Sequence, residues 1–216
     1  MAYSGDIKIC GLSTIEAVDA VIAGGATHAG FIFFAKSPRH VSVDQAAQLA
    51  ARAKAGGLKT VAVTVDASDT DLAEIMAIML PDILQLHGRE TPERTLEIKT
   101  KFGLPVMKAI AISEVADLAK LNPFLGIADR FLLDAKPPKD AVLPGGNAVS
   151  FDWNLVGHLD GSVDYLLAGG LDDSNVVEAI SIANAPGLDI SSGVESAPGI
   201  KDVAKIAAFL KAARDG

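Results

Sequence analysis

The chain has 216 residues, of which 50% are hydrophobic and 21% are charged, and its formal net charge is −8. This composition excludes a disordered chain and is typical of one large globular domain, or at most two small ones. The negative charge comes without any basic tract, which makes nucleic acids and anionic membranes poor partners.

The only cysteine, Cys10, cannot form a disulfide within the chain, and no Cys or His pair has the spacing of a structural zinc site. No apolar run approaches the ~20 residues that span a membrane. The first residues also lack the pattern of a signal peptide. We therefore expect a cytoplasmic protein that binds neither nucleic acid nor membrane and needs no metal or other cofactor.

Eight short apolar runs, rich in β-branched residues, recur along the chain. They cover residues 6–10, 28–33, 59–65, 82–87, 104–110, 129–135, 164–169 and 188–191. Each run is nearly continuous in apolar residues, which is typical of parallel strands that are buried on both faces.

Helical signals lie between these runs. Two capping-box pairs, Ser13 with Glu16 and Ser42 with Gln45, predict helix starts, as does Thr91 before Pro92. Glycine pairs at 24–25 and 56–57 predict helix ends. Apolar stripes at helical spacing are Leu72, Ile75, Met76 and Met79, and later Ile200, Val203, Ile206, Ala207 and Leu210.

Strand and helix alternate eight times, which predicts an α/β fold with a single (β/α)8 TIM barrel over residues 1–216. An open doubly wound sheet is the alternative. The even spacing of the runs favours the barrel, and no Gly-x-Gly-x-x-Gly motif follows any strand. We find no linker and no change of composition that would divide the chain.

Barrel enzymes carry their active sites where the strands end, so the residues at these ends are the candidates. Cys10 ends the first run. A lone strand cysteine is most often a small buried packing residue, but at this position it could be a nucleophile or general base. A base must be a thiolate, which requires an electropositive neighbour, and Lys8 should share its face of the strand.

Two further charged residues follow strands. Asp134 ends the run "RFLLDA", where partial loss of solvent would suit its carboxyl group to general-acid work, although a helix cap is the plainer interpretation. Arg39, in "AKSPRH", is either an exposed cation or a fork for a substrate carboxylate or phosphate. His87 and His40, taken alone, are more typical of satisfied polar groups than of ligands.

Glycines follow the last two strands, in "LAGGL" with Gly169 and Gly170 and in "SSGVE" with Ser192 and Gly193. Such loops let backbone N–H groups approach a phosphate, although turn chemistry alone would also explain them. Together with Arg39, and with His87 and Gly88 at the end of the fourth run, these loop residues form the candidate substrate-binding set. The set suits proton transfer on a phosphorylated sugar, such as an aldose–ketose isomerisation.

Seven segments taken together resemble the phosphoribosylanthranilate isomerase family of tryptophan biosynthesis. They are "KICGL", "GFIFFAKSPRHV", "LQLHG", "FLLDAKPP", "PGGNAVSFDW", "LAGGL" and "DISSGVESAPGIKD". The resemblance implies an Amadori rearrangement of N-(5-phosphoribosyl)anthranilate to 1-(2-carboxyphenylamino)-1-deoxyribulose 5-phosphate. It also implies that Cys10 is the general base, Asp134 the general acid and Arg39 the holder of the anthranilate carboxylate, with the phosphate on the two glycine loops.

The long Pro- and Gly-rich segment 135–150 departs from the family, because "GGNAVSFDW" has Ala148 where the family often has glycine.

Three alternative functions compete with the isomerase. The histidine-pathway barrel with the same chemistry has Asp where Cys10 stands, and phosphopentose epimerases need paired His and Asp metal ligands. A barrel that only binds a phosphorylated ligand would need neither Cys10 nor Asp134. We expect a monomer or homodimer.

Overall fold

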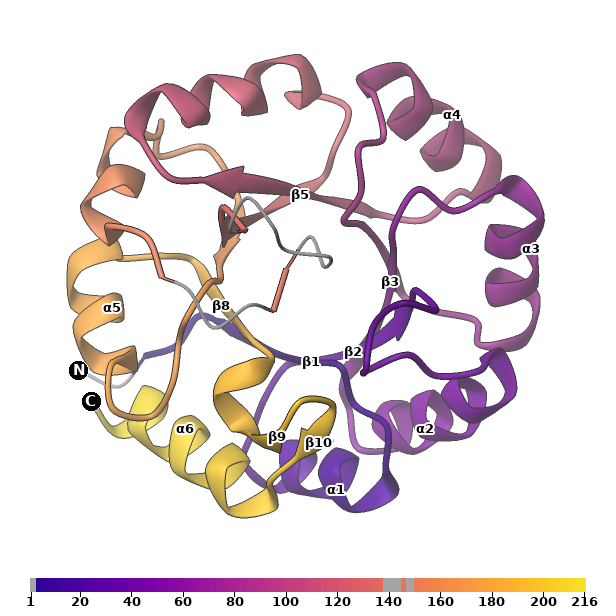
Figure 1. Ribbon diagram of the computed structural model, residues 1–216, viewed down its shortest axis with the longest axis horizontal. Coiled ribbons are helices and arrows are strands. Elements are labelled where there is room, and N and C mark those ends of the chain that lie inside the picture. The colour runs from indigo at the N-terminus through magenta and orange to yellow at the C-terminus, as the bar shows by residue number, and fades with distance from the viewer. Residues whose placement is uncertain (1–2, 138–144, 147–149) are drawn as a thin grey trace.

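The protein's computed structural model describes residues 3–137, 145–146 and 150–216, and eight parallel strands in it close into a barrel. Each strand pairs with the next along the chain, and β1 pairs with β8 to close the ring. The strands form the inner ring in Figure 1, and the helices surround it. The predicted barrel is confirmed, and the open sheet is excluded.

All eight apolar runs are strands, and their ends differ from the predicted ones by small shifts. The barrel strands are β1 (Asp6–Cys10), β2 (His28–Phe33), β3 (Lys59–Thr64), β4 (Ile83–Leu86), β5 (Val106–Ile112), β6 (Arg130–Ala135), β7 (Tyr165–Leu167) and β8 (Gly187–Ile190). After β8 the chain forms a small antiparallel pair, β9 (Glu195–Ala197) with β10 (Ile200–Lys201), which the sequence did not indicate.

Helices connect the strands on the outside of the barrel. The α-helices are α1 (Ile15–Ala23), α2 (Val43–Ala55), α3 (Asp69–Ile78), α4 (Pro92–Phe102), α5 (Val176–Ala183) and α6 (Val203–Asp215). The connections after β5 and β6 contain 3₁₀ helices instead, η1 (Val115–Phe124) and η2 (Trp153–His158), and a short one, η3 (Ser192–Val194), follows β8. None of the helices in the described part of the chain is long and apolar enough to cross a membrane.

The predicted helix starts are correct within one residue. Thr14, not Ser13, caps α1, because its hydroxyl accepts a hydrogen bond from the Ala17 N–H at 3.2 Å. Ser42 caps α2 as predicted, but the Gln45 side chain donates to the Ser13 carbonyl instead of completing a capping box. Thr91 caps α4, whose first residue is proline.

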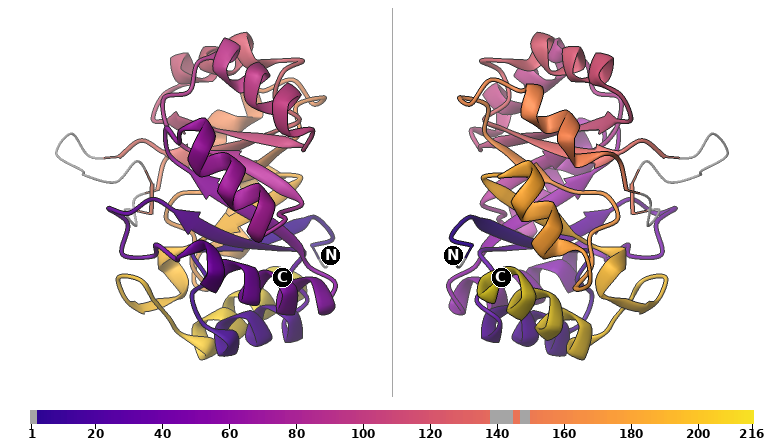
Figure 2. Two further views of the ribbon diagram at one scale, coloured as in Figure 1. Left: turned by 90° about the vertical axis from the view of Figure 1, so that its right-hand side faces the viewer. Right: turned by 90° about the vertical axis from the view of Figure 1, so that its left-hand side faces the viewer.

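The last predicted stripe is partly wrong. Ile200 belongs to β10, because α6 begins only after its cap at Asp202, and Ala207 faces solvent. The buried face of α6 consists of Ile206, Phe209, Leu210 and Ala213, at helical spacing. Figure 2 shows α6 and α1 lying side by side against the barrel.

The inside of the barrel has an apolar part and a polar part. Met107, Leu132 and Leu166 pack together inside it. Lys8 and Asp189 lie in the ring where β1 meets β8, and Asp189 also lines the pocket at the carboxyl ends of the strands. The apolar part stabilises the barrel, and the polar part leads into the candidate site.

We predict that Ile206→Ala lowers the free energy of unfolding by about 2–5 kcal/mol, because the side chain is fully buried and its loss leaves a cavity. Val203→Ala in the same helix is the control, since Val203 is 48% exposed and its loss should cost no more than about 0.5 kcal/mol. Urea denaturation measures both, and equal losses would show that the assigned buried face of α6 is wrong.

Candidate active site

A pocket opens at the carboxyl ends of the strands, with about 510 Å³ of empty space including its mouth. Its chemically active lining consists of Cys10, Arg39, Gln85, His87, Asp134 and Asp189. We call it the main pocket. A second space, here the glycine pocket, adjoins it and is lined by Gly169, Gly170 and Ser192 together with Asp134 and Asp189. Because Asp134 and Asp189 line both, one ligand can extend across the two spaces.

Seven of the nine predicted site residues therefore line these two pockets. The other two, Gly88 and Gly193, line neither. A Cβ atom on Gly88 would lie 2.4 Å from the Asp66 carboxylate, and one on Gly193 would lie 2.0 Å from the Leu171 carbonyl oxygen. Close packing is thus sufficient to explain both glycines, and their role in substrate binding stays a prediction.

Cys10 is buried at the end of β1 and lines the main pocket. Burial raises the pKa of the Cys10 thiol, and the charge of Asp189 adds to the rise, while Lys8 and Lys201 act in the opposite direction. A general base at Cys10 requires a lowered pKa. Lys8 does share the face of Cys10, but desolvation outweighs its charge, so the pKa of the thiol lies above its ordinary value and not below it.

Asp134 is the next-to-last residue of β6, and both of its carboxylate oxygens lie near donors. Oδ1 accepts a hydrogen bond from the Ala135 N–H at 2.9 Å, and Oδ2 lies 3.5 Å from Nε2 of His87. The Gln85 amide nitrogen lies 2.9 Å from Nδ1 of His87. An amide nitrogen can only donate, so Nδ1 accepts and the ring proton sits on Nε2, facing Asp134.

Gln85 was not among the predicted residues. Its side chain is fully buried inside the barrel, and its amide oxygen has no hydrogen-bond partner among the described residues. The signal was present in the sequence, because Gln85 and His87 are two positions apart on one strand and so face the same side. Gln85 orients His87, and His87 orients Asp134.

Arg39 is buried and already paired. Its Nε and Nη2 atoms donate to the two carboxylate oxygens of Glu195 at 2.7 and 2.9 Å, and Nη2 also lies 3.3 Å from the Gly146 carbonyl oxygen. The remaining nitrogen, Nη1, lies against Gly146, where a Cβ atom would come within 2.6 Å of it. One edge of the predicted fork is therefore occupied by the protein itself.

Glu195 is the centre of a buried network of ion pairs and hydrogen bonds, which we call the hub, and it was not among the predicted site residues. Besides Arg39 it accepts hydrogen bonds from Lys201 at 2.7 Å and from the Gly199 N–H at 3.2 Å. Lys201 in turn donates to the Ser191 carbonyl oxygen at 2.8 Å. Burial alone would raise the pKa of Glu195, but Arg39 and Lys201 outweigh it and hold that pKa below its usual value. The hub ties the loop after β2 to the chain that follows β8.

The glycine pocket contains two successive residues in the left-handed region, Gly169 with φ of 86° and Gly170 with φ of 65°. Non-glycine residues rarely adopt this conformation, so the loop turns sharply at the mouth of the pocket. The Asn175 side chain donates to the Gly170 carbonyl oxygen at 2.8 Å and fixes the turn. Ala148, where the sequence departs from its family, lies outside the described residues.

Comparison with known proteins decides the family. A family model described as N-(5'phosphoribosyl)anthranilate (PRA) isomerase matches residues 7–212. The N-(5'-phosphoribosyl)anthranilate isomerase of Rhizobium meliloti (strain 1021) is 58% identical over 209 residues, which are 97% of each chain. That of Mesorhizobium japonicum is 60% identical over 211 residues, which are 97% of this chain and 95% of the relative. The chain belongs to the N-(5'-phosphoribosyl)anthranilate isomerase family.

Membership of this isomerase family confirms the predicted enzyme of tryptophan biosynthesis. A crystal structure of phosphoribosyl anthranilate isomerase from Thermotoga maritima has a TM-score of 0.87 and 30% identity, covering 98% of this chain and all of the other. Another solved isomerase, in complex with reduced 1-(o-carboxyphenylamino)-1-deoxyribulose 5-phosphate, has a TM-score of 0.82 and 27% identity, again over 98% of this chain and 100% of the other.

We predict that Glu195→Gln lowers the free energy of unfolding at pH 7 by about 3–5 kcal/mol, because Arg39 and Lys201 stay buried without their counter-charge. The folded-state pKa of Glu195 is lowered, so its contribution is complete above the unfolded pKa of about 4.3. That contribution is lost as the pH falls through the folded value.

The difference from the parent protein should therefore shrink when urea denaturation is repeated at decreasing pH. Glu97→Gln is the control, since Glu97 is 68% exposed in its ion pair with Arg94 and should contribute no more than about 1 kcal/mol. A pH-independent difference for Glu195→Gln would contradict an electrostatic role for the hub.

Proposed function

We propose that this chain carries out the Amadori rearrangement of N-(5'-phosphoribosyl)anthranilate with Cys10 as general base and Asp134 as general acid. The observation that supports the proposal is that both residues line one pocket, at the strand ends where barrel enzymes act. Arg39 lines the same pocket, and the glycine pocket adjoins it. This arrangement offers an acid, a base, a cation for a carboxylate and a phosphate site along one ligand.

The proposed reaction begins at the sugar ring. Asp134 donates its proton to the furanose ring oxygen, so that the C–O bond breaks and a protonated Schiff base forms. This cation makes the proton on the neighbouring carbon acidic, and the Cys10 thiolate removes it to give an enol-amine. Tautomerisation moves a proton from the enol oxygen to the adjacent carbon and gives the ketone product. Transfer of a proton from the Cys10 thiol to the Asp134 carboxylate then returns both groups to their starting states. One acid and one base are sufficient for these steps.

The two ends of the substrate would be held separately. Arg39 lines the main pocket, and Glu195 occupies its Nε and Nη2 atoms, so we assign the anthranilate carboxylate to Nη1. We assign the phosphate to the backbone N–H groups of the glycine pocket, with Gly169, Gly170 and Ser192 nearest to it. His87 lines the main pocket, with its proton on the nitrogen that faces Asp134.

The direct test is a fluorescence assay in which purified protein is added to freshly prepared N-(5'-phosphoribosyl)anthranilate. Loss of the anthranilate signal faster than in buffer is the expected result. The phosphoribosyl compound of the histidine pathway serves as the second substrate. Turnover of that compound alone would favour the rival barrel, and binding of either compound without turnover would favour a ligand-binding role.

We predict that Cys10→Ala and Asp134→Asn each reduce kcat by roughly 10²–10⁴-fold, because each removes a positioned acid or base. Asp134→Asn should change KM less than kcat, since the amide still donates a hydrogen bond to the ring oxygen but cannot deliver a proton. Circular dichroism checks that both variants fold. If a folded variant keeps a kcat close to that of the parent protein, the substituted residue is a packing residue and not an acid or base.

We predict that Arg39→Ala weakens binding of the substrate by roughly 10- to 150-fold, the value of a hydrogen bond to a charged group. An analogue that keeps the ribose phosphate but lacks the carboxylate is the control, and its affinity should change little. Because loss of the Glu195 pairing affects both ligands alike, only the ratio of the two affinities reports on the carboxylate. An unchanged ratio would mean that Arg39 does not hold it.

Three further assignments stay proposals. We expect residues 1–216 to act as a single domain in the cytoplasm, a location that the lone cysteine supports because it cannot form an intrachain disulfide. Assembly as a monomer or homodimer is expected, and a solved relative from Thermotoga maritima, with a TM-score of 0.83, is described as monomers generated from a dimeric isomerase. We also expect catalysis without a metal or other cofactor.

A further inference from the structure

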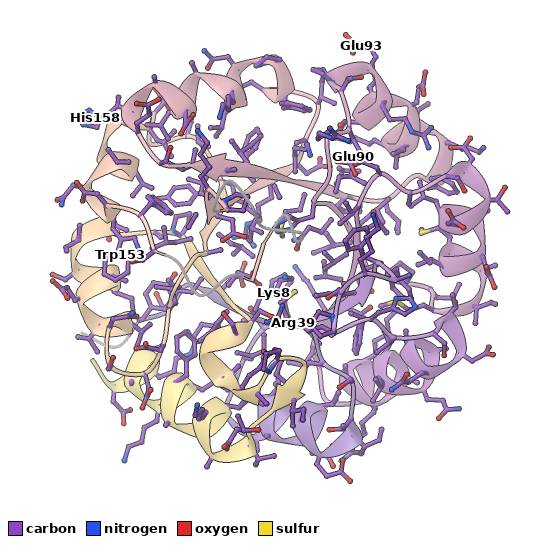
Figure 3. The ribbon with its side chains drawn as sticks, viewed as in Figure 1. Lys8, Arg39, Glu90, Glu93, Trp153 and His158 are labelled. Atoms are coloured by element: carbon purple, nitrogen blue, oxygen red, sulfur yellow. The ribbon has the colours of Figure 1, made fainter. Side chains whose placement is uncertain are left out.

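Lys8 is a fully buried lysine inside the barrel. Figure 3 labels its side chain toward the middle of the barrel. Its ammonium donates to Oδ1 of Asp189 at 2.6 Å, and the β1–β8 register puts the two residues directly opposite each other. Asp189 also lines the main pocket, so the pair connects the buried interior with the site.

Lys8 and Cys10 converge on one glycine. They are two positions apart on β1 and face the same side of the strand. A Cβ atom on Gly30, across the register in β2, would lie 3.0 Å from Sγ of Cys10 and 3.1 Å from Cε of Lys8. The absence of a side chain at Gly30 therefore lets the lysine chain and the thiol lie next to each other.

Packing alone does not explain a charge at this place. Inside the same barrel Met107, Leu132 and Leu166 fill space without charge. A methionine would occupy the volume of Lys8 without the cost of desolvating an ammonium and a carboxylate, which in many proteins equals or exceeds the attraction between them. Stability alone therefore does not account for the pair.

We propose that Lys8, held by Asp189, is a positioning residue that provides the counter-charge for the Cys10 thiolate. An ammonium has three donor hydrogens, so it can stay bonded to Asp189 and still turn a donor toward the sulfur. The inference rests on the proposed function, in which Cys10 is the base. The electrostatic effects of the two charges on the thiol agree with this proposal, since Lys8 lowers the pKa of the thiol and Asp189 raises it.

Other charges also face Cys10 and must be separated from Lys8. Lys201, on β10, lowers the pKa of the thiol as well, but it is bonded to Glu195 and Ser191. Three more charged or titratable residues line the same pocket. They are Arg39 in the loop after β2, His87 directly after β4, and Asp134 in β6. A test that changes only Lys8 or Asp189 leaves all of these in place.

The experiment titrates Cys10 in the free protein, by the ultraviolet absorbance of the thiolate and by the pH dependence of alkylation with iodoacetamide. Cys10 is the only cysteine, so both signals come from one atom, and a Cys10→Ser blank removes the tyrosine background. We expect the midpoint to rise by about one pH unit or more in Lys8→Met, and to fall in Asp189→Asn, where the lysine remains but the negative charge is gone.

Lys108→Met is the matched control. Lys108 is also a buried lysine in an ion pair, with Glu90 at 2.8 Å, but it belongs to β5. Figure 3 shows Glu90 in a different part of the molecule from Lys8. Loss of Lys108 should destabilise the fold to a similar extent and leave the thiol midpoint where it was. Shifts of equal sign in all three variants would indicate a general structural effect and overturn the proposal.

Asp189→Asn keeps the proposal testable if Lys8→Met does not fold, because the change is nearly isosteric and Lys8 can still donate to the amide oxygen. An unchanged or raised midpoint in a folded Asp189→Asn variant would overturn the proposal. Failure of the proposed function has a different signature. Cys10→Ala would then keep its kcat, while the thiol midpoint would still respond to Lys8 and Asp189.

Discussion

The pairing of β1 with β8 closes the barrel, and it places Lys8, Asp189 and Cys10 next to one another in the site. Lys8 and Asp189 are 181 positions apart in the chain, yet the closing register sets them opposite each other. The same pairing brings Cys10 to the chain after β8, where the Ser191 hydroxyl donates to the Cys10 carbonyl oxygen at 3.1 Å. A shift of one residue in this register would turn Lys8 and Cys10 out of the barrel together.

The cations around the site are paired before any ligand arrives. Lys8 is bonded to Asp189, and Arg39 and Lys201 share Glu195. Behind β4, the Lys108–Glu90 pair holds the loop that carries His87, because Glu90 also accepts from the Gly88 N–H and Lys108 donates to the Gly88 carbonyl oxygen. Buried charges left alone would cost several kcal/mol each, so this pairing lets a strongly polar pocket exist inside an apolar barrel. An entering anion then competes with carboxylates that are already in place.

Local patterns in the sequence were sufficient to predict the barrel and most of the site. Continuous apolar runs identify buried strands, and parallel strands bring their carboxyl ends to one face, so Cys10, Arg39, His87 and Asp134 could be placed together. The 3₁₀ helices after β5 and β6 escaped this argument, because spacing alone does not distinguish them from α-helices. The cap at Thr14 was missed by one residue because adjacent Ser13 and Thr14 are chemically equivalent candidates.

Long-range electrostatics could not be predicted in this way. The pairing of Arg39 with Glu195 joins residues 156 positions apart, and no local pattern indicates which carboxylate will meet which guanidinium. The pKa of Cys10 shows the same limit. The direction of its shift depends on the balance between burial and the charges around it, and in the closed barrel burial outweighs Lys8.

The raised pKa of Cys10 also affects how readily the sulfur is oxidised. Oxidants attack the thiolate of a cysteine far faster than its thiol, and the later stages of that oxidation are irreversible. Burial raises the pKa of the only cysteine and so lowers the fraction of the vulnerable thiolate at a given pH. In the proposed reaction the sulfur acts as a thiolate, so the burial that raises the pKa of Cys10 also slows its oxidation.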